Sequence, residues 1–296
     1  MVDILGLVLR QFSSGSITGV CTQPGTGLCA PESGALVTGD RGFSRPLLLL
    51  SALTAASELA VKVLYFTPSQ IQSLPISFQG ARRAECLKKI RFVYPKTLEE
   101  LLEDVASLHE LVPQSGSLPS LLIVDGLEQY VCGPAAQDRT PQEAQSAAAH
   151  VVALLHDTAA FLTQKLGARA ENQDQNQNQT QDQVQSQCRV IVSFQPEWEG
   201  QGGCPALVSD PILSVLERYL QVRCTTEKVR RGEEPNEWLF CLTGPGLQAD
   251  GDGKSEERLQ WRVVLKSNGT LDFCPISRVK EDTLETLQNP VEVKDD

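Results

Sequence analysis

The pattern of apolar and polar positions divides most of the chain into short strands and longer helices. Compact apolar runs and alternation predict strands over residues 34–38, 61–66, 120–125, 189–195, 220–226, 237–243, 260–266 and 270–276. Helical spacing and capping residues predict helices over residues 47–61, 97–111, 140–165 and 210–219. Strands that alternate with helices and then follow one another directly predict an α/β fold with a mainly parallel sheet and a C-terminal antiparallel extension.

Three segments depart from this regular order. Residues 1–33 mix an apolar start with Gly, Ser and Pro, which predicts a loosely ordered arm or an added strand in front of a core at 34–278. Residues 170–187 repeat Gln, Asn and Asp with almost no apolar side chains, so we expect a disordered insertion. Residues 279–296 form an acidic tail.

Composition narrows the possible partners. The net charge of −11 excludes a general attraction to nucleic acid or anionic membranes, so a polyanion would need a local basic patch. The nine cysteines include no C-x-x-C and only three histidines accompany them, which argues against a zinc site. We find no apolar run long enough to span a membrane, and we expect a soluble cytosolic or nuclear protein with no membrane partner.

One strand-to-helix turn nearly matches the phosphate-binding pattern G-x-x-x-x-G-K-[ST]. Its residues are Gly39, Asp40, Arg41, Gly42, Phe43, Ser44, Arg45 and Pro46. Gly39 takes the place of the first glycine, while Ser44, Arg45 and Pro46 replace the second glycine, the lysine and the hydroxyl residue. Ser44 adds a Cβ where backbone must approach phosphate, and Pro46 removes both a Mg²⁺ ligand and an N–H donor. An ordinary Gly-rich turn without a ligand remains the alternative.

A carboxylate in the expected place supports the nucleotide hypothesis. The apolar run Leu-Leu-Ile-Val ends at Asp125, where a nucleoside triphosphatase needs a carboxylate to hold Mg²⁺ and its water. A buried parallel strand that ends on any acid would look the same. The two features together and in this order favour a nucleotide-binding core.

Several segments resemble a known family. Lys-Ile-Arg-Phe-Val-Tyr-Pro at 89–95, Leu-Leu-Ile-Val-Asp-Gly-Leu-Glu at 121–128 and Leu-Leu-His-Asp-Thr-Ala-Ala at 154–160 are similar to the ATPase-like subunit of the metazoan Shu complex. That subunit is a distant RecA-like recombinase paralogue, and the resemblance covers residues 34–275. It implies a RecA-like core that binds single-stranded DNA and supports recombinase filaments in homologous recombination repair, in the nucleus.

The resemblance also implies partners, cofactors and further site residues. The partners are the SWIM-type zinc-finger protein and recombinase paralogues, and the cofactors are ATP and Mg²⁺. Gln195 would take the place of the polar γ-phosphate sensor. The loops at 133–140, with Arg139, and 196–207, with Trp198, would contact DNA, although acidic neighbours make Trp198 better suited to anchor a protein partner.

A cluster of cations supplies a second candidate DNA contact. Arg82, Arg83, Lys88, Lys89 and Arg91 fall within ten residues of an otherwise acidic chain. A solvated cationic face is the alternative. We therefore predict a DNA-binding recombination mediator with weak or lost ATPase activity; a genuine ATPase and a scaffold without DNA contact are the rivals.

Overall fold

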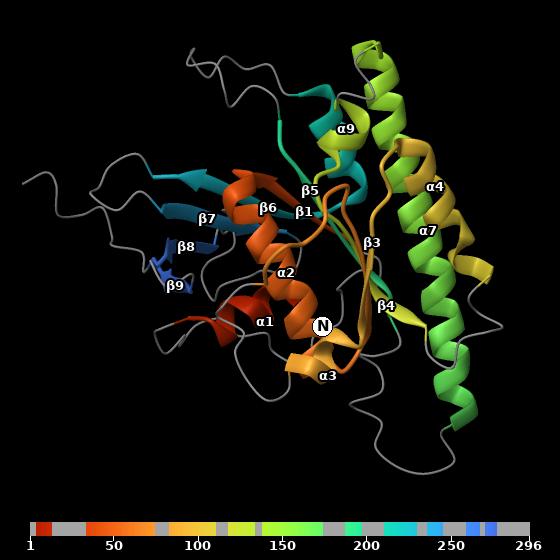
Figure 1. The fold of residues 1–296 in the computed structure, drawn as a ribbon, viewed down its shortest axis with the longest axis horizontal. Helices are drawn as coiled ribbons and strands as arrows, with labels where there is room; N and C mark the ends of the chain where they lie inside the picture. Colours follow the sequence, from red (N-terminus) through yellow and green to blue (C-terminus); the bar gives the residue numbers. More distant parts are fainter. Residues whose placement is uncertain are drawn as a thin grey trace, which may run out of the picture.

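The computed structural model shows one continuous mixed sheet with helices against its two faces (Figure 1). The described residues are 4–13, 34–74, 83–110, 118–133, 138–173, 187–196, 210–229, 236–244, 259–266 and 270–276. Within them the strands lie in the order β3-β2-β4-β5-β1-β6-β7-β8-β9.

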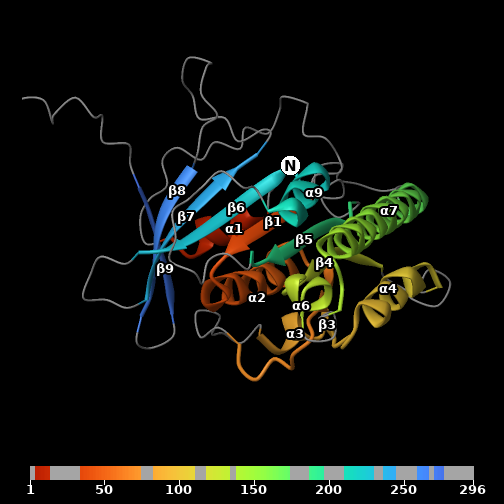
Figure 2. The same cartoon turned by 90° about the horizontal axis from the view of Figure 1, so that it is seen from above.

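The strands divide into a parallel part and an antiparallel part (Figure 2). The parallel strands are β1 (Ala35–Gly39), β2 (Lys62–Phe66), β3 (Ile90–Val93), β4 (Pro119–Val124), β5 (Arg189–Phe194) and β6 (Val222–Lys228). The antiparallel strands that follow β6 are β7 (Glu237–Thr243), β8 (Leu259–Leu265) and β9 (Leu271–Pro275). The predicted α/β class, with a mainly parallel sheet and an antiparallel C-terminal extension, is confirmed.

Apolar side chains on both faces of the parallel strands explain why helices cover both sides. One face packs against α1 (Ile4–Gln11), α2 (Arg41–Glu58) and α3 (Arg83–Leu87). The other face packs against α4 (Leu98–Ala106), the short 3₁₀ helix η1 (Ser107–Glu110), α6 (Glu128–Val131), α7 (Pro141–Gln173) and α9 (Pro211–Tyr219). All six residues of β4 are buried, as expected for a strand covered on both faces.

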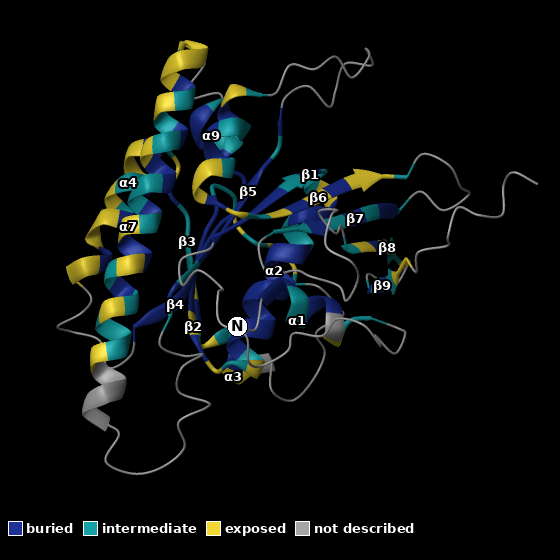
Figure 3. Ribbon diagram, turned by 180° about the vertical axis from the view of Figure 1, so that it is seen from behind, coloured by how far each residue is buried: buried dark blue, intermediate teal, exposed yellow. Residues whose placement is uncertain are grey.

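Helix α2 is the most enclosed of the long helices. It is buried along most of its length between the sheet and α1, whereas α7 keeps an exposed outer side (Figure 3). This burial fixes the position of the α2 N-terminus, where the candidate nucleotide site begins.

The N-terminal segment differs from the prediction. Residues 4–11 form a helix rather than the predicted loose arm or added strand, and Ile4, Leu5, Val8 and Leu9 are all buried. The spacing of these four residues repeats with the helical period, so they form one apolar face that packs beside α2. Beyond this helix, Ser13 makes a single parallel bridge to Phe273 of β9. Residues 14–33 lie outside the described part of the chain.

Two predicted helix boundaries also change. Helix α2 begins at Arg41, earlier than the predicted start at residue 47, because Asp40 caps it. Helix α7 continues past the predicted end at Lys165 to Gln173, so the first residues of the predicted insertion are helical. The rest of the insertion up to residue 186 and the tail at 279–296 lie outside the described residues. Among the described helices, none is both long and apolar enough to cross a membrane.

Candidate nucleotide site

The turn between β1 and α2 places the motif residues, and Gly39 is its first requirement. Gly39 has φ +120°, and a Cβ at this position would lie 2.1 Å from the carbonyl oxygen of Thr226 in the neighbouring strand β6. Any larger residue would therefore strain the backbone and force β1 and β6 apart. Close packing within the sheet accounts for this glycine without a ligand.

Asp40 is the N-cap residue of α2, and its carboxylate lies at the N-terminus of the helix. Its Oδ1 accepts a hydrogen bond from the backbone N–H of Gly42 at 2.8 Å. Its carbonyl oxygen accepts from the N–H groups of Phe43 at 3.0 Å and Ser44 at 2.9 Å. The Gly42 N–H, which a phosphate-binding loop would offer to a ligand, is thus bonded to the Asp40 side chain, while the Phe43 and Ser44 N–H groups bond to its backbone carbonyl within the first helical turn.

The second oxygen of Asp40 ties this turn to the antiparallel extension. The indole Nε1 of Trp238, in β7, donates to Asp40 Oδ2 at 3.0 Å. Phe43 stacks on the Trp238 ring with centroids 5.5 Å apart and contacts Phe240 and Phe273 edge-on or tilted. Phe43 is fully buried, so its side chain belongs to the hydrophobic core.

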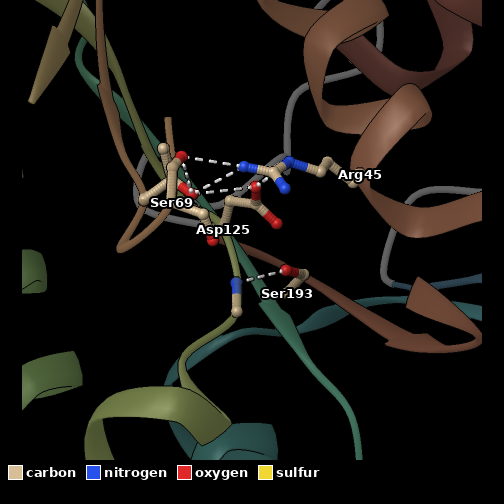
Figure 4. A network of polar contacts seen from close by, with 6 residues as sticks. Arg45, Ser69, Asp125 and Ser193 are labelled. Carbon is tan, nitrogen blue, oxygen red and sulfur yellow. Dashed lines mark hydrogen bonds and ion pairs between the residues drawn. The ribbon is translucent and has the colours of Figure 1, made fainter. Parts of the chain in front are cut away.

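Arg45 faces Asp125, as the nucleotide hypothesis requires of these two positions. Arg45 Nε lies 3.1 Å from Asp125 Oδ2 (Figure 4). Arg45 Nη2 donates to the Thr67 hydroxyl at 3.2 Å and to the Ser69 carbonyl at 2.9 Å. The Thr67 hydroxyl in turn donates to Asp125 Oδ2 at 3.2 Å. The turn after β1 and the carboxyl end of β4 therefore meet, with the guanidinium bonded to the chain itself.

The acidic groups at this edge of the sheet titrate abnormally because they are buried. Desolvation raises the pKa of Asp125, although Arg45 and Arg41 oppose it. Desolvation also raises the pKa of Glu128, against a hydrogen bond from the Gln195 backbone N–H. The pKa of Tyr65 is raised by burial and further by the charge of Asp125.

These residues, as arranged, do not fit ATP with Mg²⁺. The backbone donors of the first turn are bonded to Asp40, and Arg45 is bonded to Asp125, Thr67 and Ser69. Pro46 lies inside α2, where it offers neither a hydroxyl nor an N–H. The predicted cofactors therefore have no prepared site in this arrangement.

Comparison with known proteins adds relatives at the level of sequence. No family model matches the chain. ATPase SWSAP1 of Mus musculus is 32% identical over 257 residues, which cover 87% of this chain and 78% of that protein. ATPase SWSAP1 of Homo sapiens is 31% identical over 242 residues, covering 81% and 88%. The chain belongs to the SWSAP1 family. The crystal structure of the RadB recombinase matches with a TM-score of 0.49 and 14% identity, covering 82% of this chain and 91% of that one.

Lys88 and Lys89, two residues of the predicted cationic cluster of this SWSAP1 family member, lie at the opposite end of the parallel strands from Asp125. They precede the amino end of β3, where Ile90 pairs with Val63 of β2, whereas Asp125 follows the carboxyl end of β4. Lys88 is exposed, and Lys89 Nζ donates to the Ala56 carbonyl in the last turn of α2 at 3.3 Å.

The remaining predicted DNA contacts are dispersed. Arg91 is exposed and lies near Asp104 of α4; desolvation raises the pKa of that carboxyl, and the charge of Arg91 partly opposes the rise. Arg139 donates to the Tyr130 carbonyl at 3.0 Å and pairs with Glu99 at 3.1 Å, which places it between α6 and α4. Arg82 lies outside the described residues, as do the Arg83 side chain and Trp198. DNA binding by these SWSAP1 family residues stays a prediction.

Several residues at the site were not among those predicted. Thr67 and Ser69 follow β2, which neighbours β4, so the predicted parallel order could have indicated that they reach Asp125. Trp238 carries no such signal, because it reaches Asp40 from a strand of the antiparallel extension. Gln195 lies beside Glu128 through its backbone N–H, and its predicted role as a phosphate sensor in this family stays a prediction.

Proposed function

We propose that this SWSAP1 family member is a RecA-like mediator subunit that binds single-stranded DNA and supports recombinase filaments in homologous recombination repair. The proposal depends on one observation above all: Lys88 and Arg91, which flank the start of β3, are both exposed in a chain of net charge −11. A local basic surface on an acidic protein attracts a polyanion without attracting the protein to every acidic surface.

Weak or lost ATPase activity is part of the proposal. Hydrolysis needs donors that point at the transferred phosphoryl group and a metal held beside it. In this chain Arg45 is directed at Asp125 instead, and Pro46 supplies no Mg²⁺ ligand. The activity therefore resides in binding rather than in turnover.

The proposed partners and location follow from the resemblance of residues 89–95, 121–128 and 154–160 described above. They are the SWIM-type zinc-finger protein and recombinase paralogues, in the nucleus. Co-purification of the full chain with a SWIM-type zinc-finger protein is the expected result, and its failure would remove this partner from the proposal.

DNA binding is tested by anisotropy of a labelled oligothymidine at several salt concentrations. The Lys88→Ala/Arg91→Ala variant should bind more weakly, and the slope of log K against log salt should fall by about 1.4 if both side chains contact phosphates of a single strand. Lys165→Ala/Arg223→Ala changes the net charge equally, at positions on α7 and β6, and should leave the slope unchanged. Equal effects of the two variants would show that only net charge matters and would reject the β3 edge as the DNA surface.

A genuine ATPase is the second candidate, because both named relatives are called ATPases. Release of labelled phosphate by the full chain, with and without single-stranded DNA, tests it. We expect turnover at the level of a protein-free control. Turnover that disappears in the Asp125→Ala variant would instead establish the enzyme.

A further inference from the structure

We infer that the nucleotide site of this chain is occupied by the chain itself: the Asp40 carboxylate takes the place of a bound phosphate at the N-terminus of α2. This inference rests on the proposed loss of ATPase activity and goes beyond it, because a site that is filled internally excludes the nucleotide rather than merely failing to hydrolyse it.

The position of the carboxylate is the first step. The N–H groups at a helix N-terminus, together with the helix dipole, attract an anion. Asp40 supplies that anion from within the chain, because its Oδ1 accepts from the Gly42 N–H at 2.8 Å. The Phe43 and Ser44 N–H groups bond to the Asp40 backbone carbonyl as part of the first helical turn. An incoming phosphate would have to displace a negative charge from the donors it needs, and like charges at this distance repel strongly.

The second step is that Asp40 cannot turn aside freely. Its Oδ2 accepts from Trp238 Nε1 at 3.0 Å, and the ring of Trp238 is 3% exposed. Phe43 stacks on the same ring from within the first turn of α2. Displacing the carboxylate would leave a buried indole N–H without its acceptor and would loosen an aromatic cluster.

The third step concerns the cationic partner of a phosphate. Arg45 stands in the place of the lysine, yet its Nε and Nη2 bond to Asp125, Thr67 and Ser69. Asp125 itself is fully buried. The Gly42 N–H and the Arg45 guanidinium, one from each half of a nucleotide site, are therefore bonded to carboxylates of the same chain.

The inference predicts that a nucleotide neither binds to the folded protein nor stabilises it. We expect MgATP and pyrophosphate, each at 1 mM, to leave the melting temperature of the full chain unchanged. A ligand present at about 100 times its Kd would raise it measurably, by several degrees for a protein of this size. The ¹⁵N–¹H signal of the Trp238 indole, assigned by its absence in Trp238→Phe, should not move with either ligand.

Asp40→Asn tests the role of the charge, and the fold provides a matched control. Asp210 caps α9 with nearly the same backbone angles, φ −52° and ψ 122° against −57° and 122° for Asp40, and it accepts from the N–H groups of Ile212 and Leu213. Asparagine caps helices as well as aspartate does. It has one acceptor oxygen, however, and cannot serve Gly42 and Trp238 with separate carboxylate oxygens.

We expect Asp40→Asn to shift the Trp238 indole signal and to lower the melting temperature by about 4 °C more than Asp210→Asn does. A Trp238 signal that is unmoved in Asp40→Asn would overturn the inference. So would a shift of that signal in the wild-type chain on addition of MgATP, because the nucleotide would then displace Asp40.

The two proposals fail in different ways. MgATP binding without phosphate release would contradict self-occupation and leave the proposed loss of ATPase activity intact. Phosphate release would contradict both. Absence of DNA binding by the wild-type chain in the anisotropy experiment would contradict the mediator role and leave the inference about Asp40 untouched.

Discussion

The two ends of the parallel strands use their charges in opposite ways. At the carboxyl ends, Arg45 bonds to Asp125, and Asp125 is fully buried. At the amino ends, Lys88 and Arg91 remain exposed around β3. A charge paired inside a protein affects folding and attracts little from outside, whereas an exposed charge contributes little to folding and attracts ligands. Substitutions at the carboxyl ends of the strands should therefore change the stability of the fold, and substitutions at the amino ends should change DNA binding.

The largest effect is expected from Asp125→Ala. It leaves the guanidinium of Arg45 without its carboxylate in a partly buried place, which should lower the free energy of unfolding by about 3 kcal/mol, since Arg45 retains some access to solvent. Glu99→Ala provides the control. It removes the carboxylate partner of Arg139 at the same 3.1 Å, but Glu99 is 72% exposed, so about 0.5 kcal/mol or less is expected. Urea denaturation measures both, and equal losses would contradict the comparison.

A smaller effect on stability is expected from Lys89→Met, at the amino end of β3. Lys89 Nζ donates to the Ala56 carbonyl near the C-terminus of α2, a position where a cation stabilises the helix. Methionine keeps most of the side-chain volume and removes the charge, so we expect a loss of about 0.5–1 kcal/mol by urea denaturation. A loss as large as that of Asp125→Ala would show that this edge, too, depends on an internal charge.

The pH dependence of Glu128→Gln tests the cost of burying a carboxylate. Desolvation raises the pKa of Glu128 in the folded state, so the folded protein holds this proton to a higher pH than the unfolded chain does. Its contribution to stability therefore falls as pH rises from the ordinary carboxyl pKa, about 4.3, through the raised value. Glu128→Gln should stabilise the protein at pH 7.5, and the gain should vanish below pH 4.

Glu143→Gln is the control of opposite sign. The backbone N–H and side chain of Thr140 hydrogen-bond the Glu143 carboxylate and lower its pKa, so this group stabilises the folded state above the ordinary carboxyl pKa. Its replacement should destabilise at pH 7.5 and have no effect in acid. Urea denaturation at both pH values compares the two variants, and a shared sign would contradict the assignment of causes.

The smallest effect on folding is expected from the DNA-binding variant Lys88→Ala/Arg91→Ala. Both side chains are exposed, so the free energy of unfolding should change by about 0.5 kcal/mol or less. Circular dichroism during urea denaturation checks this value. A large loss would make its weaker DNA binding a consequence of unfolding.

Most of the sheet could be predicted because its strands are short apolar runs. The predicted strand at 237–243 coincides with β7, and the run before Asp125 became β4. The meeting of the turn after β1 with the carboxyl end of β4 also followed from sequence, since the carboxyl ends of parallel strands lie at one end of a sheet; the ion pair between Arg45 and Asp125 was not predicted. Local patterns and sheet geometry were sufficient for both.

The features that were missed are a residue with two possible roles, a contact between distant residues and a short N-terminal helix. Asp40 could be a variable position of a phosphate-binding pattern or a helix cap, and the pattern concealed the cap. Its contact with Trp238 joins residues 198 positions apart, and no local pattern specifies such a pair. The helix at 4–11 was missed because Gly and Ser farther along the segment outweighed four regularly spaced apolar residues.

Gly39 carries one more consequence. Its positive φ and its closeness to the Thr226 carbonyl mean that alanine at this position would strain the backbone and clash with β6, with or without a bound phosphate. The first glycine of a nucleotide-binding pattern can therefore be required by strand packing alone, independently of any bound phosphate. A glycine at this position is therefore not by itself a sign of ATPase activity, because the packing of β1 against β6 also requires it.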